Sequence, residues 1–229
     1  MIVSQALLGC ATDGALGADT TDTGNDTGTG ATSCVLTAAL TEGPYFVDEK
    51  LNRADIRSDP GSAIISAGVP LGLTFNVSRI DSSACTPLTG AYLDVWHADA
   101  AGAYSDVGSS SRRFLRGYQI TDGSGIARFT TVYPGWYSGR AVHVHFKLRL
   151  FAGATTTYEF TSQFFFNESL TDTVHAQSPY SSRGSRNTRN TTDGIYNSLS
   201  ATEKAGLTLQ ATADGTGYAG VINLGVRVG

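Results

Sequence analysis

The sequence predicts an all-β protein, an antiparallel β-sandwich with long loops and very little helix. Several short segments alternate between apolar and polar residues, which is the period of a strand with one buried face. Turns rich in glycine separate these segments, as they do in sandwiches and barrels. With 41% hydrophobic residues among 229, the chain can bury one sizeable core. It contains no uncharged apolar run of the ~18–20 residues that a membrane span needs.

Five segments carry the strand pattern. In the first, Leu71, Leu73, Phe75 and Val77 alternate with small or polar residues, which predicts a half-buried strand. The others are residues 91–97, 126–133, 142–150 and 221–228. Only residues 201–206 indicate a helix. Residues 167–197 have no periodicity, so we expect a long active-site loop there that wraps the sheet or lines a site.

The first 33 residues differ in composition from the rest. Residues 1–10, MIVSQALLGC, end like a bacterial lipobox, in which the cysteine (here Cys10) receives a lipid. Because the apolar stretch is short and has no basic residue before it, we expect a truncated lipoprotein signal or a chance match. Residues 11–33 consist mainly of Asp, Thr, Gly and Ala, which favours a disordered tether. The folded domain is therefore expected at residues 34–229.

The net charge of −4 comes from the tether, which contains four aspartates and no basic residue. The predicted domain has 16 acidic and 16 basic residues. Nucleic-acid binding requires clustered positive charge, so we expect no nucleic-acid partner.

Two cysteines, Cys34 and Cys85, remain in the predicted domain once Cys10 is set aside. In an oxidising compartment they would form one disulfide; two separate buried thiols are the alternative. The tether and the lipobox-like sequence favour the disulfide and an extracellular or cell-surface location.

His143 and His145 are separated by one residue on the predicted strand 142–150. Side chains alternate along a strand, so both imidazoles point to the face that also carries Lys147 and Arg149, about 6–7 Å apart. That arrangement suits two positions on one metal ion, and a solvated polar face is the alternative. Aromatic residues, among them Tyr137, precede the pair. A hard trivalent cation can displace a phenol proton, so tyrosine ligands favour ferric iron over zinc.

Four segments, in order, resemble the intradiol ring-cleavage dioxygenases, which include the catechol 1,2- and protocatechuate 3,4-dioxygenases. The likeness is greatest to the compact secreted branch of that family. The segments are TEGPY at 41–45, LDVWHADAAGAYS at 93–105, FLRGYQITDGSG at 114–125 and YPGWYSGRAVHVHFK at 133–147. The resemblance runs from about residue 34 to residue 197 and covers most of the predicted domain.

The resemblance implies one non-haem Fe(III) ion per chain, held by two tyrosines and two histidines. The tyrosine of the family's Gly-x-Tyr-Ser element corresponds to Tyr104, and the one after the Pro-Gly turn to Tyr137. The His-x-His pair corresponds to His143 and His145. In the family pattern Tyr137 and His143 are axial, whereas Tyr104 and His145 are equatorial beside a hydroxide. Tyr137 is also expected to accept a substrate proton.

The resemblance also implies four pocket residues. Arg140 would stabilise negative charge that develops on the substrate. Gln163 corresponds to the family's pocket glutamine, and Pro44 and Tyr45 would line the substrate pocket. For Arg140, Pro44 and Tyr45 the alternative is ordinary turn chemistry.

The two remaining histidines are not expected to bind metal. His97 lies in the Trp-His-Ala-Asp element, where family members can carry glutamine. His175 falls in the predicted loop, where we expect it to be solvated.

The implied function is Fe(III)-dependent intradiol cleavage of catechol-type aromatics with dioxygen to cis,cis-muconate-type products. The implied partners are a catechol-type small molecule and dioxygen, with membrane contact only through a lipid on Cys10. The sequence indicates neither the oligomeric state nor the particular catechol.

Two other classes of protein stay open at this point. A non-catalytic extracellular binding module would use the aromatics as a ligand platform. A zinc hydrolase using the histidine pair would leave Tyr104 and Tyr137 without a role.

Overall fold

The computed structural model describes residues 35–81, 84–108 and 111–228. The predicted signal at 1–10, the tether at 11–33 and Cys34 lie outside these residues. The described part of the chain consists mostly of strands, which confirms the all-β prediction. In chain order its elements are β1 (Pro70–Ile80), β2 (Cys85–Pro87), β3 (Tyr92–Trp96), β4 (Arg116–Ile120), β5 (Ile126–Val132), β6 (His143–Ala152), β7 (Thr155–Phe166), α1 (Glu168–His175), η1 (Tyr180–Arg183), η2 (Asn190–Thr192), α2 (Gly194–Asn197), α3 (Ala201–Leu207), β8 (Thr208–Leu209), β9 (Thr212–Asp214) and β10 (Gly217–Val226).

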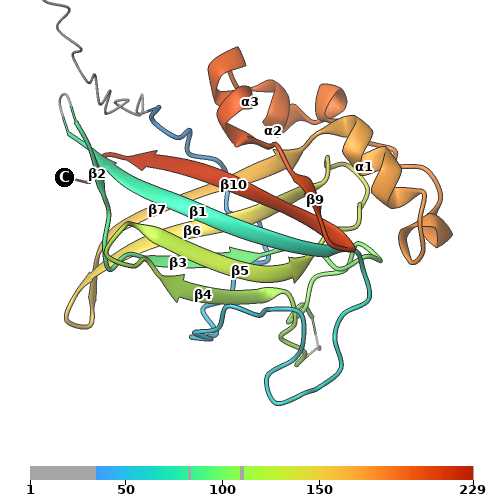
Figure 1. Ribbon diagram of the computed structural model, residues 1–229, viewed down its shortest axis with the longest axis horizontal. Coiled ribbons are helices and arrows are strands. Elements are labelled where there is room, and N and C mark those ends of the chain that lie inside the picture. Colours follow the sequence, from blue (N-terminus) through green and yellow to red (C-terminus); the bar gives the residue numbers. More distant parts are fainter. Residues whose placement is uncertain (1–34, 82–83, 109–110, 229) are drawn as a thin grey trace, which may run out of the picture. The chain divides into compact units, whose positions relative to one another are not determined.

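The strands form two five-stranded sheets, and in Figure 1 the sheet with β1 and β10 lies in front of the sheet with β6 and β7. One sheet has the order β2-β1-β10-β9, with β5 also paired to β1, and the other has the order β4-β3-β6-β7-β8. Most neighbours are antiparallel, but β1 pairs with β10, and β7 with β8, in parallel. The predicted sandwich is therefore confirmed, and its pairing is mixed because the last long strand returns beside the first.

The hydrophobic core lies between the two sheets. On β1, Leu71, Leu73 and Phe75 are at most 1% exposed, as the alternation predicts. The Phe75 ring lies 5.9 Å from the ring of Phe146 on β6 and 6.0 Å from that of Phe164 on β7, measured between centroids. Aromatic contacts of this kind join the two sheets.

Residues 167–197 are not the loop that the sequence predicts, since they contain α1, α2 and both 3-10 helices. The α1 helix begins where the side chain of Asn167 accepts hydrogen bonds from the backbone N–H groups of Ser169 and Leu170. Helices this short repeat their apolar residues too few times to produce a visible period. The expectation that His175 is solvated is also wrong. It lies on α1, is 8% exposed, and its Nε2 lies 2.9 Å from the carbonyl oxygen of Pro134.

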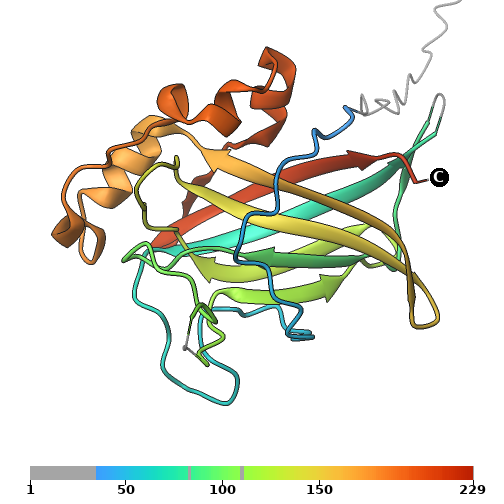
Figure 2. The same cartoon turned by 180° about the vertical axis from the view of Figure 1, so that it is seen from behind.

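An extended segment, residues 35–53, crosses the outer face of the sheet that contains β6 (Figure 2). We call it the N-terminal strap. It is held by backbone hydrogen bonds, for example from Leu40 N–H to the carbonyl of Thr161 on β7. It also carries acidic residues that pair with the polar face of β6: Glu42 with Lys147, and Asp48 with Arg149.

The strap covers the outer face of β6, so the solvated polar face considered above is excluded. His143, His145, Lys147 and Arg149 are all at most 7% exposed. Buried cations of this kind are tolerated when they are paired.

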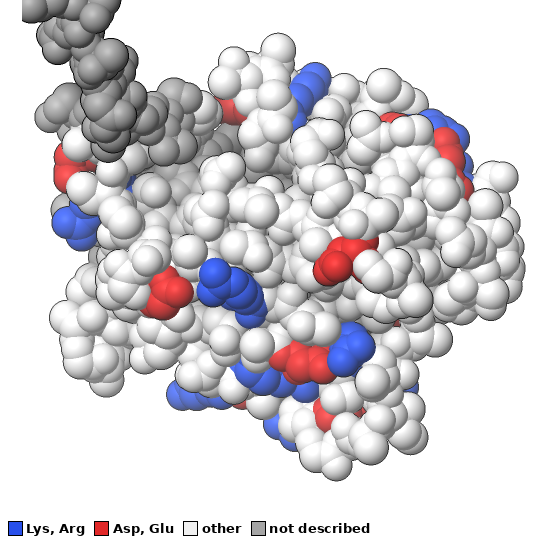
Figure 3. All heavy atoms as spheres, viewed as in Figure 1, with Lys and Arg blue, Asp and Glu red and all other residues white. Residues whose placement is uncertain are grey.

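No helix in the described residues is long and apolar enough to span a membrane. Figure 3 shows a largely uncharged face with scattered charged side chains of both signs.

Candidate active site

Four side chains from three segments converge at one end of β6. His143 and His145 lie on β6, Tyr137 lies in the loop before it, and Tyr104 follows β3. The Nε2 atom of His143 lies 3.0 Å from Nε2 of His145, 3.1 Å from the phenol oxygen of Tyr137 and 3.5 Å from that of Tyr104. The structure therefore brings together all four residues that the sequence predicts as ligands.

The surroundings of His143 determine which ring nitrogen carries the proton. Its Nδ1 lies 2.6 Å from the carbonyl oxygen of Ala141. A carbonyl only accepts hydrogen bonds, so Nδ1 is the donor and Nε2 carries the lone pair. That lone pair faces His145, Tyr104 and Tyr137, and it can accept a good hydrogen bond from only one of them.

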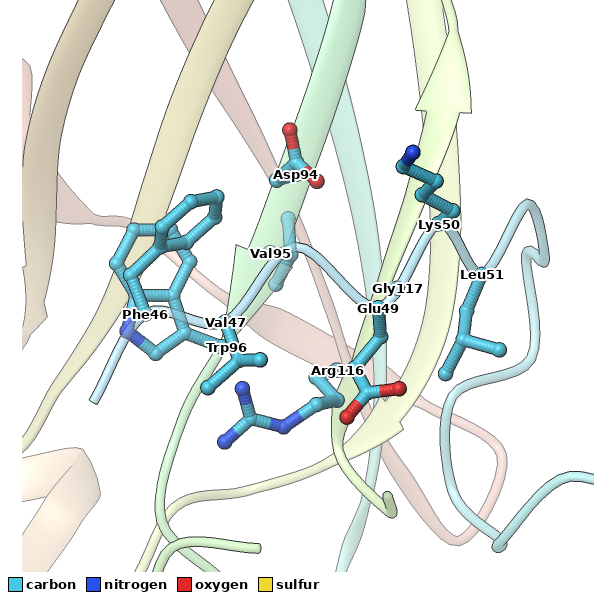
Figure 4. Close-up of a pocket in the computed structure, with 10 residues that line it drawn as sticks. All are labelled: Phe46, Val47, Glu49, Lys50, Leu51, Asp94, Val95, Trp96, Arg116 and Gly117. Carbon is cyan, nitrogen blue, oxygen red and sulfur yellow. The ribbon is translucent and has the colours of Figure 1, made fainter. Parts of the chain in front are cut away.

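Apart from the 3.0 Å contact between its Nε2 and that of His143, His145 is held by packing. Its ring is stacked on that of Trp96, with centroids 4.9 Å apart and planes 7° apart. Its Nδ1 is buried and has no hydrogen-bond partner among the described residues. Phe46 of the strap packs on the Trp96 ring at 4.9 Å, and Figure 4 shows the two side chains together at the edge of a small pocket.

Burial sets the protonation of the four groups. It lowers the pKa of His143 to about 3, with the Arg140 charge as the second cause, and it lowers the pKa of His145 well below the ordinary value. Both imidazoles are therefore neutral near pH 7, the form that binds a metal. Burial raises the pKa of the Tyr104 and Tyr137 phenols, so their ionisation requires a strong positive charge beside them.

The four donors fit a hard cation. Two nitrogen ligands at about 2.1 Å from a metal and at right angles would be about 3.0 Å apart, which matches the separation of the two Nε2 atoms. Within the described ranges no group of three or more His, Cys, Asp or Glu side chains could hold a metal ion. A metal ion at this site would therefore depend on the tyrosines, which does not favour the zinc hydrolase considered above.

Arg140 and Gln163 lie in one polar network beside these donors. The Nη2 group of Arg140 donates to Oε1 of Gln163 at 2.6 Å, and its Nε donates to Oδ2 of Asp193 at 2.9 Å. Gln163 in turn donates from Nε2 to the carbonyl of Thr41 in the strap, at 2.6 Å. The sequence reasoning missed Asp193, because a single aspartate 53 positions after Arg140 gives no local signal.

The two other predicted pocket residues belong to the strap. Tyr45 is stacked on Tyr104, with ring centroids 4.4 Å apart. Pro44 is exposed in the turn before it. The structure thus brings Tyr45 to the site, while Pro44 has no comparable contact with the four donors.

His97 is buried next to the site, and both of its ring nitrogens are engaged elsewhere. Its Nδ1 lies 2.8 Å from the carbonyl of Ala98, and its Nε2 lies 2.7 Å from Oγ1 of Thr131. These contacts agree with the expectation that His97 is not a ligand.

The burial of His97 predicts how the stability of the protein depends on pH. Burial lowers its pKa from 6.5 to about 4, so the unfolded chain binds a proton more readily than the folded protein. The free energy of unfolding should therefore fall as the pH drops from 6.5 towards 4, by up to about 3 kcal/mol from this residue. We expect urea unfolding of His97→Gln to depend less steeply on pH in that window. Thr131→Val, which keeps the titrating ring, is the control and should remain steep; equal slopes for wild type and His97→Gln would contradict the prediction.

Residues 41–178 match a family model described as Dioxygenase. The chain is similar to an intradiol ring-cleavage dioxygenase from Tetranychus urticae, with 30% identity, a TM-score of 0.71, and coverage of 85% of this chain and 95% of that one. It is also similar to the dioxygenase domain of a dioxygenase carbohydrate-binding protein fusion from Streptomyces sp. SirexAA-E. There the identity is 29% and the TM-score 0.61, with coverage of 85% of this chain and 100% of that one.

At 19% identity, 3-chlorocatechol 1,2-dioxygenase from Rhodococcus opacus 1CP shares the fold, with a TM-score of 0.58 and coverage of 85% of this chain and 73% of that one. A search among curated proteins finds no match.

Proposed function

The chain belongs to the intradiol ring-cleavage dioxygenases, a family of oxidoreductases, and we propose that it uses Fe(III) and dioxygen to cleave catechol-type aromatics between their hydroxyl groups. The products would be of the cis,cis-muconate type. The observation that carries this proposal is the convergence of Tyr104, Tyr137, His143 and His145, with His143 Nε2 within 3.5 Å of the other three donor atoms.

We propose these four residues as the ligands of one ferric ion per chain. When bound, the ion would supply Lewis-acid activation of a catecholate towards dioxygen. Two neutral imidazoles and two phenolates balance two of its three positive charges. The fixed Nδ1 contact of His143 and the Trp96 stack on His145 hold both rings ready for binding.

Tyr137 is the proposed acceptor of a substrate proton. Burial raises the pKa of its phenol, so the neutral phenol is the favoured form of this side chain whenever no cation holds its oxygen. The residue is only partly buried, so part of its side chain is open to a ligand. Proton transfer to Tyr137 would leave the substrate as the anion that the reaction requires.

Arg140 is proposed to stabilise negative charge on the substrate, and Gln163 to orient it. The Arg140 side chain is only 18% exposed, so its charge acts in a site from which most water is excluded. Tyr45 is stacked on Tyr104. Tyr45 and Pro44 are proposed to line the pocket against the substrate ring.

The first experiment is a visible spectrum and metal analysis of the purified protein, followed by catechol under air. Charge transfer from the tyrosinates to ferric iron should give a burgundy colour, with about one iron per chain. Catechol should shift this band, and muconate absorbance should then appear. A protein that stays colourless and inactive after ferric reconstitution would overturn the proposal and favour the binding module.

Gly43 provides a test of the iron site from the strap side. It has φ +70°, and an added Cβ would lie 3.3 Å from Cε1 of His145. Trp96 occupies one face of that ring, so we expect Gly43→Ala to displace the imidazole and to weaken iron binding about tenfold. Gly61→Ala is a matched control, because Gly61 has φ +77° and nothing within 4 Å of an added Cβ. Both variants should lose about 1 kcal/mol of stability from backbone strain; equal iron affinities, measured by chelator competition, would contradict the prediction.

We also propose an extracellular or cell-surface location. Cys85 is disulfide-bonded, and disulfides persist mainly in oxidising compartments. Cys34, its predicted partner, lies outside the described residues, so the Cys34–Cys85 pairing stays a prediction. Peptide mapping by mass spectrometry without reduction would test it.

A further inference from the structure

Asp193 connects two parts of the site. Its side chain is completely buried and accepts four hydrogen bonds. Oδ1 accepts from the backbone N–H groups of Ile195 and Tyr196, at 2.7 and 3.0 Å, which caps α2. Oδ2 accepts from Nε of Arg140 at 2.9 Å and from the backbone N–H of Ala141 at 2.7 Å.

The Oδ2 contacts restrain Arg140 from one side. Together with the Nη2 bond to Gln163, the bond at Nε fixes the plane of the guanidinium at two points. The remaining nitrogen, Nη1, has no hydrogen-bond partner among the described residues. Nη1 is therefore the group of Arg140 that is available to donate a hydrogen bond to a substrate.

Asp193 Oδ2 also restrains His143, through the backbone of Ala141. The N–H of Ala141 is held by Asp193, while its carbonyl oxygen lies 2.6 Å from Nδ1 of His143. This carbonyl determines which way the imidazole points. One carboxylate therefore acts on both the proposed ligand His143 and the proposed charge-stabilising Arg140.

Asp193 carries its negative charge at neutral pH. Burial alone would raise its pKa, but hydrogen bonds from the backbone of Ala141 and Tyr196 and the Arg140 charge lower the pKa overall. A cap for α2 would need only Oδ1, and serine or asparagine would serve. The position of Oδ2 requires an ionised carboxylate, because two donors point at it.

We propose that Asp193 is a positioning residue of the active site, which holds Arg140 towards the substrate and fixes Ala141 behind His143. This inference rests on the proposed function, since it gives Arg140 and His143 their roles. It predicts that most of the loss in kcat on removing the Asp193 carboxylate is expressed through Arg140, beyond any loss of helix capping.

The test compares Asp193→Asn with Ser200→Ala in the iron-loaded enzyme. Asparagine can still cap α2, but its amide cannot accept from Arg140 and Ala141 at Oδ2 while Oδ1 serves the cap. We expect kcat for catechol to fall about 10–100-fold, with KM changed less than about threefold because Arg140 acts on developing charge. Ser200→Ala is the control for lost helix capping, because the Oγ of Ser200 caps α3 by accepting from the N–H of Glu203. This variant should leave kcat unchanged.

The double variant tests whether Asp193 acts through Arg140. In an Arg140→Gln background, Asp193→Asn should lower kcat by less than about threefold. Equal kcat values for Asp193→Asn and wild type, or fully additive losses, would overturn the inference.

A second measurement needs neither activity nor the variant at Asp193. In the metal-free wild-type protein the Nε–H proton of Arg140, assigned by its absence in Arg140→Lys, should exchange slowly with water because Asp193 holds it. Rapid exchange would overturn the inference even if Asp193→Asn fails to fold. If the iron-loaded wild type cleaves no catechol, the proposed function is refuted instead. The exchange measurement would still decide whether Asp193 holds Arg140.

Discussion

We expect His145→Ala and Tyr104→Phe each to lose ring-cleavage activity by more than about 10²-fold, beyond the usual effect of losing an outer-shell partner. His145 supplies the nitrogen 3.0 Å from that of His143, and no cluster of His, Cys, Asp or Glu in the described residues could replace it. Tyr104→Phe removes one oxygen and keeps the ring that is stacked on Tyr45. Iron content and the visible band should decrease in both variants.

His97→Gln is the matched control for these ligand variants. His97 is as deeply buried as His145, each being 1% exposed, but its ring nitrogens contact Ala98 and Thr131. Iron content, colour and activity should all survive this substitution. Full iron occupancy and normal colour in His145→Ala would refute the proposed ligand set.

The strands that the sequence predicts well are those with one apolar face and one face of polar or small residues. On β1 the apolar residues alternate without interruption, because only that face meets the core. β7 was missed, because its last three residues, Phe164, Phe165 and Phe166, are all buried and the alternation disappears. Phe165 packs with its ring 5.0 Å from that of Tyr196 on α2, on the side away from Phe164 and Phe75. Periodicity identifies a strand that is covered on both faces only where one of those faces is polar, as on β6, and it fails where both faces are apolar.

The candidate site divides in a similar way. The four proposed ligands could be named because they lie in short motifs that resemble those of the intradiol family, whereas local spacing alone indicated only the His143–His145 pair. The contacts that orient them are not local: Trp96 stacks on His145 from a neighbouring strand, and Asp193 reaches Arg140 from the end of the helical segment. Nor does the sequence of β6 indicate that its polar face is buried, because the strap that covers it begins about 100 positions earlier, as the Asp48–Arg149 pair illustrates. Such contacts depend on the tertiary fold, which periodicity and composition do not report.

Arg140→Gln should separate charge stabilisation from metal binding. We expect kcat to fall about 10²–10³-fold, as it does when one preorganised donor to a developing charge is removed. Iron content should be unchanged, because Arg140 bonds to Gln163 and Asp193 and not to the four proposed ligands. KM for catechol should change much less than kcat, since the interaction strengthens as the charge develops.

Arg140→Lys distinguishes the two properties of the guanidinium. Lysine keeps the positive charge but cannot bind Asp193 and Gln163 at once through a planar fork. If orientation matters as much as charge, its kcat should lie nearer to that of Arg140→Gln than to that of the wild type. Arg128→Gln, which removes an exposed arginine on β5 that lies 3.8 Å from Asp122, controls for the loss of one positive charge and should leave kcat unaltered. If Arg140→Gln keeps the wild-type kcat, the proposed ferric ion alone stabilises the substrate charge. Arg140 would then have only a structural role, joining the strap, β7 and α2 through Gln163 and Asp193.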